Sequence, residues 1–137
     1  MKRAIIAVLM IVFITVFSAL SNNIIKKRVT SLLDNTVDVS ANFDKFDKSE
    51  SERKISELIS QWKSAEKLLL FLDSHDKFEN ISELFGLLET VKNSDGKEIK
   101  NILNETENAI RIYLVSRKIT VRNILNIYKT VTIMYKM

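Results

Sequence analysis

The chain has 137 residues, no proline, no cysteine and only two glycines, and its formal net charge is +4. That length suits one domain rather than two, and the scarcity of turn-forming residues excludes a turn-rich β fold. The lack of cysteine excludes disulfides, zinc sites built on cysteine, and a lipid-modified cysteine after a signal sequence.

The beginning of the chain predicts a membrane segment. An uncharged, mostly apolar run covers residues 4–20, between Lys2 and Arg3 on one side and the basic cluster 26–28 on the other. As a helix this run would be roughly 25 Å long, slightly shorter than a bilayer core of about 30 Å, and basic flanking side chains can cover the difference. We expect an uncleaved anchor over residues 1–23, in contact with membrane lipid through residues 4–20.

Two alternatives to the anchor remain open. Ala19-Leu20-Ser21 has the form of a signal-peptidase site, so the segment would also suit a cleaved signal peptide. A buried helix of a soluble domain is the other alternative. Both flanks of the run are basic, so the positive-inside rule nearly cancels. Because a very short N-terminal tail ahead of such a segment usually stays inside, we expect the rest of the chain to be extracytoplasmic.

The apolar spacing after the anchor is helical nearly throughout. It predicts an all-α fold, in which an up-down bundle of about four helices occupies residues 24–125 and a basic C-terminal extension covers 126–137. The first helix should continue from the membrane run without a break. Its inward stripe is Ile25, Val29, Leu32, Thr36 or Val37, Ser40 and Phe43.

The second helix is expected to start near Ser49, because Ser49-Glu50-Ser51-Glu52 has the form of a capping box. The apolar run 67–72 predicts that the end of this helix is the most buried part of the bundle. Asp73-Ser74 then offers a stop and a new cap. The inward stripe, on which the tryptophan should be a core anchor, is Ile55, Leu58, Ile59, Trp62, Ala65, Leu69 and Leu72.

Two more helices are separated by the turn signal Asn93-Ser94-Asp95-Gly96. Gly86 stands alone within the third helix and is expected to be a point of close packing. Beyond Arg117, β-branched residues weaken the prediction of a helix. The inward residues should be Phe78, Ile81, Leu84, Phe85, Leu88 and Val91 on the third helix, and Ile99, Ile102, Leu103, Ile110, Tyr113 and Leu114 on the fourth.

Charge is sorted along the chain. All acidic residues lie within residues 29–109, whose net charge is −7, whereas residues 110–137 carry six basic groups and no acidic one. On a helix, one stripe would contain Arg111, Lys118, Arg122, Lys129 and Lys136. Such a basic amphipathic helix suits a lipid surface or an acidic partner. The alternative is packing on the acidic middle of the same domain, and a membrane anchor argues against nucleic acid.

The only histidine, His75, lies among acidic residues at the expected junction of the second and third helices. A cation site or an acid–base pair is conceivable there. One histidine with scattered carboxylates matches no metal motif, and we expect it to hydrogen-bond across the junction instead. The chain has no glycine-rich phosphate loop, no GxSxG and no HExxH. We therefore expect no enzyme, no cofactor and no metal.

Trp62, Leu69 and the stretch Phe71-Leu72-Asp73-Ser74-His75-Asp76-Lys77-Phe78-Glu79-Asn80-Ile81 resemble the signature of a protein family. It is the domain-of-unknown-function family 4363, whose members are short anchored proteins of clostridial and other Firmicutes bacteria. Asn123-Ile124-Leu125 resembles the family's C-terminal pattern, and the similarity covers roughly residues 1–125. The last helix departs from the family, because it lacks the usual acidic residues and continues into a basic extension.

The resemblance implies membrane attachment and a helical domain, and it implies no reaction. We expect a structural role for the motif residues Trp62, Phe71, Asp73, His75, Asp76, Glu79 and Ile81. The chain as a whole best fits a non-catalytic interaction or accessory module of the cell envelope, docked on another membrane protein. The alternatives are an extracytoplasmic ligand, cation or pH sensor and a lipid-surface-binding protein; the sequence does not indicate the oligomeric state.

Overall fold

The protein is a helical bundle from which two helices project. The structure, a computed structural model, describes the backbone of residues 1–136 and the side chains of residues 1–118 and 126–136. Within this part of the chain there is no strand, which confirms the all-α fold. The elements follow one another in the order α1 (Lys2–Asn42), η1 (Phe43–Lys45), α2 (Lys48–Leu72), η2 (His75–Lys77), α3 (Glu79–Val91) and α4 (Gly96–Lys136).

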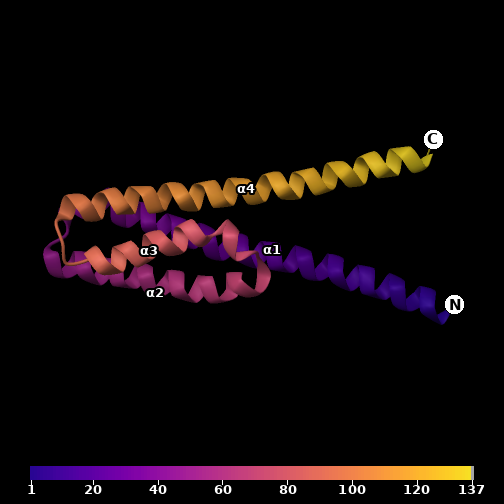
Figure 1. Ribbon diagram of the computed structural model, residues 1–137, viewed down its shortest axis with the longest axis horizontal. Helices are drawn as coiled ribbons and strands as arrows, with labels where there is room; N and C mark the ends of the chain where they lie inside the picture. The colour runs from indigo at the N-terminus through magenta and orange to yellow at the C-terminus, as the bar shows by residue number, and fades with distance from the viewer. Residues whose placement is uncertain (137) are drawn as a thin grey trace.

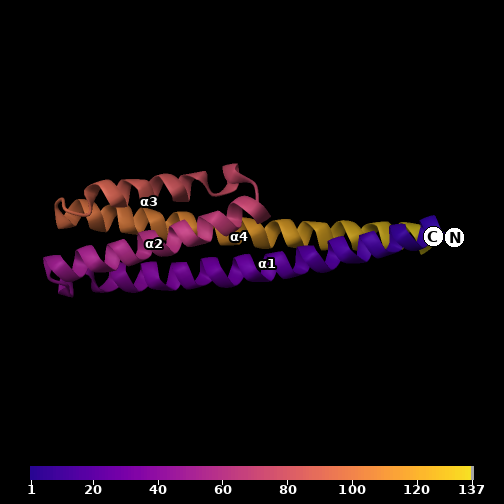
Figure 2. The same ribbon diagram turned by 90° about the horizontal axis from the view of Figure 1, so that it is seen from below.

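The four α-helices surround one core in an up-down arrangement. Each packs against its neighbours in the chain, and α1 also packs against α4, which closes the bundle. Two segments, the α1 arm (residues 2–20) and the α4 arm (residues 119–136), continue past the turn between α2 and α3 (Figure 1). Both arms leave the same end of the bundle, and both ends of the chain therefore lie beyond that end (Figures 1 and 2).

The α1 arm is the segment expected to be an anchor. A window near its N-terminus is long and apolar enough to cross a membrane, and none of that window is buried against the rest of the protein. This lack of burial argues against a buried helix of a soluble domain. The helix continues without interruption to Asn42, as expected, and its first fully buried side chain is that of Ile25.

The predicted inward stripes meet in the core. On α1 the fully buried residue is Thr36 rather than Val37. The buried hydroxyl of Thr36 donates a hydrogen bond to the Leu32 carbonyl at 2.8 Å, and that of Thr106 bonds the Ile102 carbonyl at 2.7 Å. Both polar groups are thus satisfied within their own helices, so their burial adds no unpaired donor.

Aromatic rings form the centre of the core. Trp62 on α2 is only 2% exposed. Its ring stacks on Phe85 with centroids 5.4 Å apart, and Phe78 meets it edge-on at 6.1 Å. These contacts confirm the expectation that the tryptophan is a core anchor joining α2 to α3.

The expected start of α2 is wrong by a small margin. The helix begins at Lys48, and its cap is Asp47, whose Oδ1 accepts a hydrogen bond from the Glu50 amide at 2.8 Å. Aspartate caps a helix as well as serine does, so the helix can begin at the earlier of the two capping residues.

The expected burial at the end of α2 is also wrong. Leu70 is 55% exposed and Phe71 is 90% exposed. At this level α2 gives way to the η2 turn and only α1 and α4 continue, so no further helix covers the outer face of the last turn (Figure 1). Burial here depends on where the neighbouring helices end, and an apolar run does not report that.

The α4 helix continues to Lys136, through the stretch beyond Arg117 where β-branched residues weakened the prediction of a helix. A β-branched residue costs a helix at most about 0.7 kcal/mol, whereas proline costs about 3 kcal/mol. The chain has no proline, and no glycine follows Gly96. The expected boundary between residues 125 and 126 therefore falls inside α4. The described side chains of the arm, residues 126–136, are exposed and do not pack on the acidic middle of the domain.

Replacing Trp62 with alanine should lower the free energy of unfolding by about 3–5 kcal/mol, because the cavity would lie between α2 and α3. Phe71→Ala is the matched control on the same helix and should change it by less than about 0.5 kcal/mol, since that ring is exposed. Thermal or urea unfolding in mild detergent measures both. Equal stability of the Trp62→Ala protein and the parent would contradict the core described above.

Gly86 is not the point of close packing that the sequence suggested, because it is exposed and a Cβ built there meets no atom within 4 Å. Gly86→Ala should therefore raise the free energy of unfolding by about 0.5–1 kcal/mol through helix propensity alone. In Gly96→Ala, by contrast, the new Cβ would touch the Phe43 ring at 3.4 Å, and the gain should be smaller. A loss of stability in Gly86→Ala, measured by the same unfolding experiment, would show an unseen contact.

Candidate functional site at the junction of the arms and the bundle

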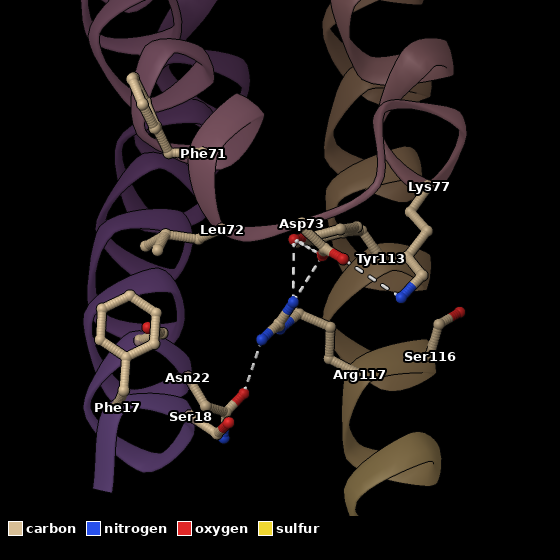
Figure 3. A pocket seen from close by; sticks show the side chains of 11 residues that line it. Phe17, Ser18, Asn22, Phe71, Leu72, Asp73, Lys77, Tyr113, Ser116 and Arg117 are labelled. Carbon is tan, nitrogen blue, oxygen red and sulfur yellow. Dashed lines mark hydrogen bonds and ion pairs between the residues drawn. The ribbon is translucent and has the colours of Figure 1, made fainter. Parts of the chain in front are cut away.

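A pocket of about 460 Å³ lies where the two arms separate from the bundle (Figure 3). One wall belongs to α1 and the opposite wall to α4, while the end of α2 and the η2 turn close it on the bundle side. Phe17 and Leu72 lie on the α1 side, opposite Arg117 (Figure 3). The polar lining residues include Ser18, Ser21, Asn22, Asp73, Lys77 and Tyr113.

Asp73 reaches the pocket because α2 ends directly before it. Its amide donates the last helical hydrogen bond, to the Leu69 carbonyl at 2.8 Å, and its extended backbone angles then end the helix. Its carboxylate accepts a hydrogen bond from the Ser74 amide at 2.9 Å, and its side chain is only 5% exposed. Asp73 is thus the C-cap of α2, and α3 begins only at Glu79, later than Asp73-Ser74 suggested.

Two side chains of α4 bind this carboxylate. Asp73 Oδ2 accepts hydrogen bonds from the Tyr113 hydroxyl at 2.7 Å and from Arg117 Nη1 at 2.5 Å (Figure 3). Tyr113 and Arg117 are four residues apart, so they share one face of the helix. The other oxygen, Oδ1, pairs with Lys77 Nζ at 3.1 Å. The buried carboxylate therefore has partners on both oxygens.

Arg117 extends the network to α1. Its Nη2 donates a hydrogen bond to Asn22 Oδ1 at 2.8 Å (Figure 3). The network thus ties together the end of α2, the point where α4 leaves the bundle and the point where α1 enters it. Arg117 Nε is buried and has no hydrogen-bond partner among the described residues.

The network shifts the pKa values of Asp73 and Tyr113. Burial by itself would raise the pKa of Asp73, but hydrogen bonds from Tyr113, the Ser74 amide and Lys77, together with the charge of Arg117, outweigh it and lower that pKa. Burial and the hydrogen bond to Asp73 raise the pKa of Tyr113 above its ordinary value. At neutral pH the carboxylate is ionised and the phenol is protonated, so Asp73, Lys77 and Arg117 together carry one net positive charge.

The motif residues expected from the sequence fall into three groups. Trp62 and Ile81 belong to the core, and Asp73 is the centre of the network. Asp73 accepts the hydrogen bonds at this junction, and the expected hydrogen bond of His75 is not among them. The ring of His75 instead meets Phe78 edge-on at 5.3 Å. The remaining members are exposed, namely Phe71, His75, Asp76 and Glu79.

The basic stripe is divided between the bundle and the α4 arm. Arg111 pairs with Glu107 of its own helix at 2.9 Å. Lys118, Lys129 and Lys136 are exposed. The side chain of Arg122 lies outside the described part of the chain. In the part that is described, no cluster of three or more His, Cys, Asp and Glu residues is arranged to hold a metal ion.

Sequence reasoning missed Asn22 and Arg117 as partners of Asp73, and it assigned Tyr113 only to the core stripe. The useful signal was an arginine one helical turn after an inward tyrosine, since a cation near a buried face needs an acidic partner. Spacing alone does not say which of the acidic residues that partner is.

Comparisons with protein-family models, curated proteins and solved structures find no match to this chain. Membership of family 4363 therefore stays a prediction from the motif. The properties of the junction are those of its own residues: a paired and buried carboxylate, a guanidinium with one unpartnered N–H, and a half-exposed lysine.

Asp73→Asn should lower the free energy of unfolding by about 1.5–3 kcal/mol, because Arg117 would lose its ionised partner. Asp76→Asn is the matched control, since Asp76 is exposed and lies only three residues away. It should change stability by less than about 0.5 kcal/mol. Urea unfolding at pH 7 compares the two variants, and equal effects would contradict the special position of Asp73.

The same variant should also change the dependence of stability on pH. Since folding lowers the pKa of Asp73, its ionised form stabilises the protein above the unfolded pKa of about 3.9. That contribution is lost as the pH falls through the lower folded pKa. The stability difference between the parent and Asp73→Asn should therefore shrink as the pH falls below about 4. A difference that stays constant down to the acid limit of folding would contradict this assignment.

Proposed function

We propose that this protein is a single-pass, N-terminally anchored, non-catalytic interaction module of the cell envelope, with its bundle on the extracytoplasmic side. The observation that carries the proposal is the continuity of α1, which runs from the unburied apolar window into the core without a break. Lys2 and Arg3 precede that window and the basic cluster 26–28 follows it. The positive-inside rule therefore nearly cancels, and the labelling experiment below decides on which side of the membrane the bundle lies.

The junction supports a structural task for the polar residues rather than a reaction. Asp73, Tyr113 and Arg117 bind one another and join α1, α2 and α4. Such a network would hold the bundle in a fixed orientation relative to its anchor. The exposed helix faces are then presented at a constant height above the membrane, which suits docking to a neighbouring membrane protein.

A second candidate is a protein that binds lipid surfaces through the α4 arm. The arm leaves the bundle at the same end as the anchor (Figure 1), and residues 110–137 contain six basic and no acidic groups. Cationic helices bind anionic membranes with about 1 kcal/mol for each basic residue near the surface. The third candidate, a pH or cation sensor, gains no support from the exposed His75, whose ring contact is with Phe78.

Labelling of a single cysteine tests the proposal, because the chain contains none. Ser94 suits the purpose, since it is exposed in the turn between α3 and α4 and its backbone amide bonds the Val91 carbonyl at 2.8 Å. We expect Ser94→Cys in intact cells to react with a membrane-impermeant maleimide and to fractionate with membranes. A cysteine inserted after Met1 is the control and should react only after lysis.

Two other outcomes would contradict the proposal in different ways. Protection of Ser94→Cys until lysis would place the bundle in the cytoplasm, where the α4 arm faces anionic lipid, and would move the second candidate to first place. Labelling in the soluble fraction only would mean that the apolar segment is a cleaved signal peptide.

A further inference from the structure

The pocket at the junction lies at the level where the apolar run of α1 ends. Ser18 and Ser21 line it from the last turn of that run and the residue just after it. In an anchored protein the headgroup region begins directly outside the hydrocarbon core. The opening of the pocket would therefore lie at the depth of the lipid phosphates.

One cationic donor, the ammonium of Lys77, remains accessible in this pocket. Lys77 is 51% exposed, and the structure pairs its ammonium with one carboxylate oxygen of Asp73. An ammonium has three donors, so it can bind a second anion without leaving the first. Arg117 lines the pocket from α4 and contributes its positive charge, while its Nε is buried. With Asp73 ionised, the net positive charge of the three side chains matches one phosphate diester.

The α1 side of the pocket carries apolar side chains next to its polar ones. Phe17 is exposed on the α1 arm, and Leu72 lies beside it (Figure 3). Phe71, which sits at the end of α2, also contributes to the lining and is 90% exposed. The phenyl rings of Phe17 and Phe71 have no polar atom, so they suit contact with an acyl chain. The pocket thus combines an anion-binding side with a side on which an acyl chain can lie.

We propose that this pocket binds an anionic phospholipid, with the phosphate at Lys77 and Arg117 and the start of an acyl chain along Phe17. The inference rests on the proposed membrane anchoring and deepens it by assigning a lipid class to the junction. A free phosphate ion shares the anionic chemistry but would leave the apolar side chains without a ligand, so the lipid fits both sides. The site is distinct from the basic α4 arm, whose residues 126–136 do not line it.

The test is a titration of the full-length protein in a neutral detergent with short-chain phosphatidylglycerol. The midpoint of thermal unfolding and the lipid adducts in native mass spectra are measured together. We expect a saturable rise of the midpoint and one adduct of high affinity. Lys77→Gln should bind about fivefold more weakly, since one basic residue near a membrane contributes about that factor. Lys77→Arg should restore binding, because it keeps the charge.

Matched variants separate the pocket from general charge. Lys97→Gln removes an exposed lysine at the start of α4, far from the pocket, and should leave the affinity unchanged. Ser18→Phe should abolish the adduct by filling the pocket without changing any charge. Because Lys77 is half exposed and the Asp73 carboxylate keeps Tyr113 and Arg117 as partners, Lys77→Gln should still fold. Its affinity can then be read directly from the adducts.

Three results would overturn the proposal. Phosphatidylcholine that binds as tightly as phosphatidylglycerol would exclude recognition of an anionic lipid. Inorganic phosphate that produces the same saturable shift would assign the pocket to a free anion. Lys129→Gln that weakens binding as much as Lys77→Gln would assign the lipid to the α4 arm. This titration requires no cell and no orientation, so its failure is distinguishable from failure of the labelling experiment.

Discussion

The ion pair between Asp73 and Arg117 closes the end of the bundle from which both arms leave. Burying such a pair removes both charges from water, which costs several kcal/mol per ion unless further hydrogen bonds offset it. Tyr113 and Asn22 supply those bonds from α4 and α1. One carboxylate thereby links three features: the place where α2 ends, the direction in which α4 leaves the bundle, and the point where α1 enters the core. Both the pocket and the proposed orientation of the bundle relative to its anchor depend on this link.

Much of the fold could be predicted because a single core requires the same helical spacing of apolar residues on every helix. The stripes containing Ile25, Trp62 and Phe85 follow from that constraint, and so does the uninterrupted α1. The start of α2 at Lys48 and the exposure of Phe71 could not be predicted in the same way. They depend on the choice among equivalent capping residues and on the level at which neighbouring helices end, and neither is encoded in local apolar spacing.

The candidate site was predictable only in part, for a related reason. Asp73 was singled out beside His75, but its partners Tyr113 and Arg117 stand 40 and 44 residues further along the chain. A sequence with many acidic and basic residues allows many such pairs, and only the packing of α4 selects one. The histidine drew attention because its chemistry is distinctive, whereas the structure uses the neighbouring carboxylate. A resemblance carried by the whole stretch does not separate these two roles.

The unbroken α1 helix has a mechanical consequence. Each residue turns an α-helix by about 100°, so the azimuth of every anchor residue is fixed relative to the core. Ser18 and Asn22 stand on the same face as Ile25 and Val29, being three, seven or eleven residues from them, and that face looks toward α4. A membrane protein that binds one face of the anchor within the bilayer would therefore set the rotational orientation of the whole bundle about the membrane normal. Rotation of the anchor about its own axis would rotate the bundle by the same angle, because α1 is one uninterrupted helix.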